Sequence, residues 1–165
     1  MEHFCVLHSK FEENKMKGIT MNDVKLFKST QSSAIQGNAN AQFRLGVMYT
    51  FGDNVNADIT EAVKWYQMAS KSGHSDAMFN LAVTYADVFG NLVEGFNWFL
   101  KAAIQGHLEA QFSVGVMYAN GEGVAIDENC AVKWYRISAE KGHAQAQFNL
   151  GVAYQKGKGE QIFVI

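Results

Sequence analysis

The sequence repeats itself about every 36 residues, and this periodicity constrains the fold more than any other feature. Glycines stand at Gly37, Gly73, Gly106 and Gly142, with spacings of 36, 33 and 36 residues. Each is followed at fixed distances by an alanine, a phenylalanine and a tyrosine. A period of this length is typical of solenoids, in which every unit buries its apolar face against its neighbours.

Each repeat contains two helical patterns joined by a turn. In the first complete unit, Ala41, Leu45 and Tyr49 lie at intervals of four residues, which places them on one stripe of a helix. The second pattern follows Asp58, a residue type that caps free N–H groups at a helix start. The fold class predicted is therefore all-α, an array of αα-hairpins. We expect the hairpin cores to be filled by three tryptophans, Trp65, Trp98 and Trp134, together with the tyrosine column, Tyr49, Tyr85, Tyr118 and Tyr154.

The repeats divide the chain, which we predict to be a single repeat domain over residues 1–165. Residues 38–73, 74–106 and 107–142 form complete repeats, residues 1–37 a degenerate capping repeat, and residues 143–165 a truncated one. The second repeat is three residues short and has Val88 where the others have a turn glycine, so its local geometry should be irregular.

The truncated repeat contains one helical pattern and a turn but no second helix. We expect the apolar face of its helix, Ala146, Leu150 and Tyr154, to lack a hairpin partner. Either the chain is a fragment of a longer array, or another chain covers this face. Self-association through the unpaired helix is one such possibility.

Charge and hydropathy exclude several classes of partner. Lys and Arg number 14 against 16 Asp and Glu, a formal net charge of −2, and no basic run occurs. Nucleic acid is therefore not expected as a partner. No stretch approaches the roughly 18 apolar residues of a membrane span, and the N-terminus lacks the features of a signal peptide. As written the chain is expected to be cytoplasmic, or secreted or periplasmic if a signal peptide upstream of Met1 is missing.

Residue types that often carry chemistry have structural explanations here. Three histidines, His74, His107 and His143, occupy equivalent positions in successive repeats. They stand too far apart to share a metal ion, and we interpret them as helix caps. Ser138 and Lys141 have the spacing of a Ser-x-x-Lys nucleophile motif, but the accompanying motifs are missing. We expect no catalytic residue, no metal site and no cofactor.

The pattern Ala-x-Phe-x-Leu-Gly-x-x-Tyr, then Gly-x-Gly-Val, Asp, Ala-x-x-Trp-Tyr and Gly, resembles the Sel-one-like repeat family, a relative of the tetratricopeptide repeat. The resemblance covers about residues 38–159. It implies a right-handed αα superhelix, bacterial by family habit, that acts as a non-catalytic adaptor for a protein or peptide on its concave face. Relatives linked to β-lactam binding leave an alternative, a small-molecule or glycan-binding protein with β-lactam-hydrolase activity.

Candidate partner-binding residues lie on the first helix of each repeat, which lines the concave face in tetratricopeptide-like stacks. The phenylalanine column is expected either on this face or in the seam between repeats. Polar, variable positions beside an apolar strip are typical of a groove that binds a peptide or a helix. The candidates are the residue after each phenylalanine (Arg44, Asn80, Ser113, Asn149), the valine column (Val47, Val83, Val116, Val152) and positions near the helix ends (Thr50, Asp87, Asn120, Lys156).

Overall fold

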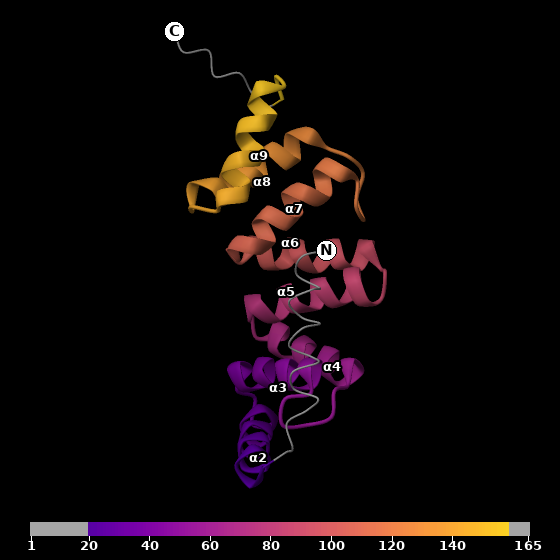
Figure 1. The fold of residues 1–165 in the computed structure, drawn as a ribbon, viewed down its shortest axis with the longest axis vertical. Helices are drawn as coiled ribbons and strands as arrows, with labels where there is room; N and C mark the ends of the chain where they lie inside the picture. Colours follow the sequence, from indigo (N-terminus) through magenta and orange to yellow (C-terminus); the bar gives the residue numbers. More distant parts are fainter. Residues whose placement is uncertain (1–19, 159–165) are drawn as a thin grey trace. The chain divides into compact units, whose positions relative to one another are not determined.

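A computed structural model of the protein describes residues 20–158, which are helical throughout apart from short connections, with no strand among them (Figure 1). The elements are α2 (Met21–Ile35), α3 (Ala39–Phe51), α4 (Ile59–Lys71), α5 (Ser75–Val83), the π-helical segment η1 (Thr84–Val88), α6 (Leu92–Ile104), α7 (Leu108–Asn120), α8 (Glu128–Glu140) and α9 (Ala144–Gln155). Over this range no helix has the length and apolar character needed to cross a lipid bilayer. The prediction of an all-α chain is confirmed.

The chain forms two compact units, residues 1–81 and 82–165, with the boundary inside α5. In the first unit α2 packs on α3, and α3 packs on α4 as an antiparallel hairpin (Figure 1). In the second unit α6 contacts η1 and α7, α7 pairs with α8, and α8 packs on α9. In α3, α7 and α9 the first helix of a repeat thus contacts the second helix of the repeat before it, as the sequence period predicts.

Helix starts follow the capping residues predicted from the sequence. The Asp58 carboxylate accepts hydrogen bonds from the N–H groups of Thr60 and Glu61 at 2.9 and 3.0 Å. The Asp127 carboxylate accepts from the N–H of Cys130 at 2.9 Å. Hydrogen bonding from Cys130, first through its backbone N–H, holds the pKa of Asp127 below its ordinary value. These bonds satisfy amides that no carbonyl within the helix can reach.

The aromatic residue that fills each hairpin is the one after the tryptophan. Tyr66 and Tyr135 are 1% and 6% exposed and Phe99 is 8% exposed, whereas the three tryptophans are only half-buried. The expectation that the tryptophans and the tyrosine column fill the hairpin cores is therefore wrong, since Tyr49, Tyr85 and Tyr118 are also half-buried and Tyr154 is exposed. One residue along a helix is a rotation of about 100°, so the tryptophan lies beside the seam while its neighbour points into it. Trp65, for example, packs on the flank of the Leu45 and Met48 cluster.

The second repeat is irregular, as predicted. Its first helix ends in the π-helical segment η1, where the N–H of Phe89 donates to the carbonyl of Thr84 at 3.1 Å. Asn91, which the sequence analysis missed, caps α6 by accepting a hydrogen bond from the Glu94 N–H at 3.1 Å. With three residues fewer than the other repeats, this one ends its first helix in a π-helical turn, and Gly90 follows it at a φ of 65°.

The two end repeats are described only in part. The capping repeat predicted for residues 1–37 is represented by α2, whose Thr30 and Ala34 are buried, while residues 1–19 lie outside the described residues. The truncated repeat is described up to Lys158, and residues 159–165 lie outside.

The helix of the truncated repeat, α9, places its predicted apolar face differently. Ala146 is fully buried, and the Tyr154 hydroxyl accepts from Arg136 of α8 at 2.9 and 3.2 Å. α8 therefore covers part of the face that was expected to lack a hairpin partner: Ala146 is buried and Leu150 half-buried, whereas Tyr154 is 42% exposed. A second face of α9, with Ala144, Phe148, Gly151 and Gln155, is exposed.

Candidate functional site

A buried tyrosine joins consecutive repeats through its hydroxyl group. In the first unit the Tyr66 hydroxyl lies 2.9 Å from the Thr50 hydroxyl, and the Asn80 side-chain amide donates to it at 3.1 Å. Thr50 donates its own proton to the carbonyl of Gly46 at 2.8 Å. Because a hydroxyl has one proton to give, Tyr66 donates to Thr50. Burial raises the pKa of Tyr66 above its ordinary value, so this chain of bonds is made by the neutral phenol.

The polar residue after each phenylalanine matches the aromatic residue of the repeat before it. Asn80 lies fourteen positions after Tyr66, and Asn149 lies fourteen after Tyr135 and hydrogen-bonds to it. Fourteen positions after Phe99, which has no hydroxyl, stands Ser113. Its hydroxyl donates to the Glu109 carbonyl of its own helix at 2.8 Å. The residue type after each phenylalanine therefore depends on the aromatic residue that packs beside it.

Two members of the phenylalanine column, Phe43 and Phe112, pack in the seam between repeats, whereas Phe148 is exposed. Phe43 stacks on His74 of the following repeat with ring centroids 4.5 Å apart, and Phe112 stacks on His143 with the same separation. These contacts favour the seam between repeats over the concave face, the other position expected for the column.

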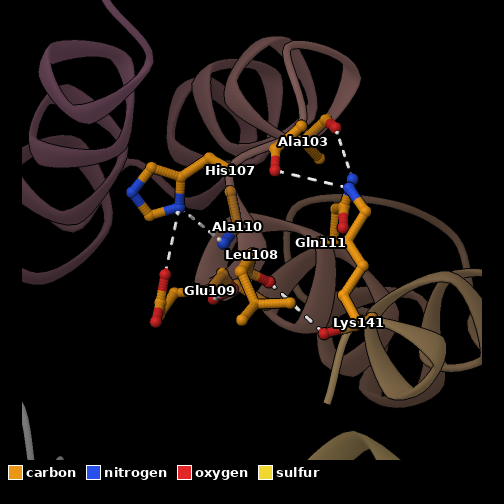
Figure 2. Close-up of polar contacts among 10 residues, drawn as sticks. Ala103, His107, Leu108, Glu109, Ala110, Gln111 and Lys141 are labelled. Atoms are coloured by element: carbon orange, nitrogen blue, oxygen red, sulfur yellow. Dashed lines mark hydrogen bonds and ion pairs between the residues drawn. The ribbon is translucent and has the colours of Figure 1, made fainter. Parts of the chain in front are cut away.

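The three repeat histidines act as helix caps, as predicted. The Nδ1 atoms of His74, His107 and His143 accept hydrogen bonds from the N–H groups of Ala77, Ala110 and Ala146 at 3.4, 3.2 and 3.3 Å. His107 Nδ1 also lies 3.5 Å from a Glu109 carboxylate oxygen (Figure 2). A nitrogen that accepts from a backbone N–H carries no proton, so capping requires the neutral ring. Over residues 20–158, no group of three His, Cys, Asp or Glu side chains is arranged to hold a metal ion.

Ser138 and Lys141 both face the start of α7. The Ser138 hydroxyl is fully buried and donates to the Leu108 carbonyl at 3.4 Å. The Lys141 ammonium donates to the Gly106 carbonyl at 3.5 Å. A nucleophile must reach a substrate carbonyl, and a hydroxyl without solvent exposure is not placed to do so.

A pocket of about 270 Å³ opens in the second unit, where α7, α8 and α9 meet. Apolar side chains form its walls, Tyr135 and Asn149 supply polar groups, and charged residues stand at its edge. Its lining consists of Ala119, Glu128, Ala131, Val132, Tyr135, Asn149, Val152, Ala153, Lys156 and Lys158. An apolar cavity with a few polar groups is typical of binding sites.

Electrostatics distinguish the two lysines at the edge of this pocket. Lys158 forms an ion pair with Glu128, which ties the turn after α9 to the start of α8. Lys156 is exposed at the end of α9. Burial raises the pKa of Tyr135 above its ordinary value and the hydrogen bond from Asn149 opposes this rise, so the phenol is neutral. The pocket thus offers an apolar wall, an amide and a cation.

Three of the twelve candidate binding residues, Asn149, Val152 and Lys156, line this pocket. Two more, Thr50 and Asn80, meet at Tyr66 in the first unit. The other candidates line neither group: Val47, Val83, Ser113 and Val116 are half-buried, and Arg44, Asp87 and Asn120 are exposed. The sequence analysis missed Glu128, Val132 and Lys158, since only the packing of α8 against α9 brings them to the pocket.

Comparison with known proteins identifies the repeats. The family model described as Sel1 repeat matches residues 39–74, 75–107, 108–143 and 144–162. A solved structure of a protective antigen present in uropathogenic Escherichia coli strains, described as displaying an SLR fold, is similar with a TM-score of 0.76 and 34% identity. The matched region is 80% of this chain and 29% of the antigen's chain. A Sel1 repeat protein from Oxalobacter formigenes is similar with a TM-score of 0.73 and 31% identity. The matched region is 84% of this chain and 62% of the Oxalobacter formigenes chain. The predicted solenoid class is confirmed by these neighbours.

One curated relative also matches. Chitin synthase regulatory factor 4 of Schizosaccharomyces pombe is 36% identical over 75 residues, which is 46% of this chain and 11% of the relative. The chain therefore spans about a tenth of this relative's length.

Proposed function

The chain belongs to the Sel1 repeat family, and on this premise we propose that it is a non-catalytic adaptor that binds a protein or peptide partner on the first helices of its repeats. Proteins built of Sel1 repeats generally act as scaffolds for protein interactions. The matching relative in Schizosaccharomyces pombe is named a regulatory factor, which supports a role exerted through contact with another protein.

The observation that carries the proposal is the pocket between α7, α8 and α9. Its apolar wall of Val132 and Val152 suits an aliphatic or aromatic side chain, and Asn149 and Lys156 can accommodate a peptide carbonyl or a carboxylate. These groups come from α8 and from α9 with its C-terminal cap, two helices that pack on each other, so binding costs little ordering of the protein.

The test is affinity capture from the source cells with the full chain, compared with Lys156→Glu. Lys133→Glu makes the same charge change at an exposed site on α8 outside the pocket, and is the matched control. We expect proteins identified with the parent chain to be retained by Lys133→Glu and lost with Lys156→Glu. Identical captured proteins for both variants would remove the pocket from the proposal, and no specifically captured protein would contradict the adaptor function.

The alternative, binding and hydrolysis of a β-lactam, depends on Ser138. Its burial against Leu108 does not favour this activity. Nitrocefin turnover by the full chain that disappears in Ser138→Ala would support hydrolysis and overturn the adaptor proposal.

A further inference from the structure

The connection between η1 and α6, in the middle of the chain, exposes a run of apolar side chains. Residues 87–93 are all exposed, and the run includes Val88 and Phe89, each 48% exposed, Leu92 at 42% and Val93 at 60%. We call these four residues the loop patch. Apolar side chains gathered at the surface in this way are typical of sites that contact another molecule.

The loop patch belongs to the repeat that is three residues short. The tyrosine of the first helix and the cap of the second are six positions apart in the second repeat, Tyr85 and Asn91, but nine in the third, Tyr118 and Asp127. In the longer connection of the third repeat the turn valine, Val124, is half-buried. In the second repeat the apolar residues of the short connection stay exposed instead.

Contacts on both sides hold the loop patch in place. The Phe89 ring packs edge-on against Tyr85 with centroids 5.6 Å apart, and the N–H of Asn91 donates to the Tyr85 carbonyl at 2.8 Å. On the other side, the turn after α7 lies directly against the start of α6, because a Cβ atom added at Gly123 would overlap the Leu92 carbonyl. The patch is therefore preformed, and a partner that binds it pays little for ordering the loop.

The charges beside the loop patch are negative. Asp87 and Glu94 flank it in the sequence, and Glu122 belongs to the turn that packs against Leu92. Residues 84–95 and 121–124 contain these three carboxylates and no Lys or Arg. Apolar area next to charge of one sign is complementary to a partner surface with apolar residues and the opposite charge.

We propose that the loop patch binds a basic amphipathic helix of a partner protein, with its apolar face on Phe89 and Val93 and its Lys or Arg side chains beside Asp87 and Glu94. The charge selects this occupant. A second copy that docked through the same surface would bring its own carboxylates against these, and an anionic membrane would be repelled in the same way. No residue of the patch lines the pocket, so this surface is additional to the one in the proposed function.

The probe is a fluorescein-labelled amphipathic peptide of leucine and lysine, and its binding to the full chain is followed by fluorescence anisotropy. A peptide with glutamate in place of every lysine is the control ligand. The test variant combines Phe89→Ser with Val93→Ser. The matched control combines Ile104→Ser with Ile137→Ser, since both isoleucines are exposed on α6 and α8 outside the patch.

We expect saturable binding of the leucine-lysine peptide that is weakened about tenfold or more in the test variant and is unchanged in the control variant, because only the former loses apolar contact area. Circular dichroism should show both variants to be folded. Asp87→Lys should weaken binding severalfold at low salt and less at high salt, where exposed charges are screened. Glu140→Lys makes the same charge change at the exposed end of α8 and should not weaken it.

No saturable binding, equal affinities of the parent and the test variant, or equal binding of the leucine-glutamate peptide would overturn the proposal. Co-sedimentation of the parent chain with phosphatidylcholine vesicles, lost only in the test variant, would assign the patch to a lipid surface and overturn it. Self-association seen by analytical ultracentrifugation and lost only in the test variant would assign it to a second copy and overturn it. The pocket variant Lys156→Glu should bind the peptide like the parent, which separates this result from the proposed adaptor function.

Discussion

The second and third repeats each have a glycine where the two helices of the hairpin approach closely, but the glycine lies on a different helix in each repeat. In the third repeat the glycine is on the first helix, where Gly115 admits the ring of Tyr135. In the second repeat Ala82 takes that position and the glycine is on the second helix, where a Cβ at Gly95 would lie 2.8 Å from the Cβ of Ala86. Close approach is therefore required of the helix pair, and either helix can supply the small residue that permits it.

The same two repeats differ in how they start their second helices and end their first. The third uses a glycine turn and an aspartate cap, with Gly121 at a φ of 74° and Asp127 on α8. The second ends its first helix in the π-helical segment η1 before Gly90, at a φ of 65°, and uses the neutral cap Asn91 on α6. Both solutions satisfy the amides at the helix start, but only one of them titrates.

The largest effect is expected from truncation of the ring in the third repeat. Tyr135→Ala should lower the free energy of unfolding by about 3 to 5 kcal/mol, because it empties a buried volume between α7 and α8. Trp134→Ala, at the half-buried neighbouring position, should cost less. Urea unfolding followed by circular dichroism measures both, and a greater cost for Trp134→Ala would contradict the placement of the core.

A smaller effect is expected at the exchanged glycine of the second repeat. Gly95→Ala should cost roughly 1 to 3 kcal/mol, since the new methyl group meets Ala86 and the Ala82 carbonyl. Adding Ala86→Gly should recover part of this loss by making room on the other helix. The double-mutant cycle, measured by urea unfolding, should give a coupling of favourable sign, and strict additivity would break the comparison.

The hydroxyl of the third-repeat tyrosine contributes less again. Tyr135→Phe makes the third repeat like the second and removes the hydrogen bond to Asn149, at a cost of about 0.5 to 1.5 kcal/mol. Once Tyr135 is Phe, the further change Asn149→Ser, which copies Phe99 and Ser113, should cost less than it does in the parent chain. Equal costs of Asn149→Ser in both backgrounds would show that the two side chains are not coupled.

The smallest effect concerns the caps and depends on pH. The pKa of Asp127 is held below its ordinary value, so its contribution to stability is complete above that value and is lost as the pH falls through the folded-state pKa. Asp127→Asn copies Asn91 and should remove this dependence below about pH 4. Urea midpoints of parent and variant at pH 7 and pH 3 test this, and an unchanged pH dependence in Asp127→Asn would contradict the role of the carboxylate.

Features fixed by local chemistry could be predicted from the sequence. The hairpins, the caps at Asp58 and Asp127 and the capping histidines depend on residues within a few positions of one another. The burial of Tyr135 instead of Trp134 depends on how α8 is rotated against α7, which the spacing alone does not define. The cover that α8 gives to Ala146 of α9 depends on the packing of these two helices in the same way.

The candidate site shows the same division. Val152 and Lys156 could be selected from their positions in the repeat, and the structure places both at the pocket. The contribution of Glu128 comes from the neighbouring hairpin and its ion pair to Lys158. The bonds of Asn80 and Asn149 to buried tyrosines required knowledge of which side chains meet across helices.

The central claim is that the glycine shared by α3, α7 and α9 is required only where the ring of a covering helix packs on it. Thermal unfolding of Gly115→Ala and Gly151→Ala in the full chain tests it most directly, because the same substitution is made at equivalent positions of α7 and α9. Gly115→Ala should lower the Tm through the overlap with Tyr135, whereas Gly151→Ala should leave it unchanged or raise it, as alanine favours a helix by about 1 kcal/mol over glycine. Equal decreases in Tm for the two variants would contradict the claim.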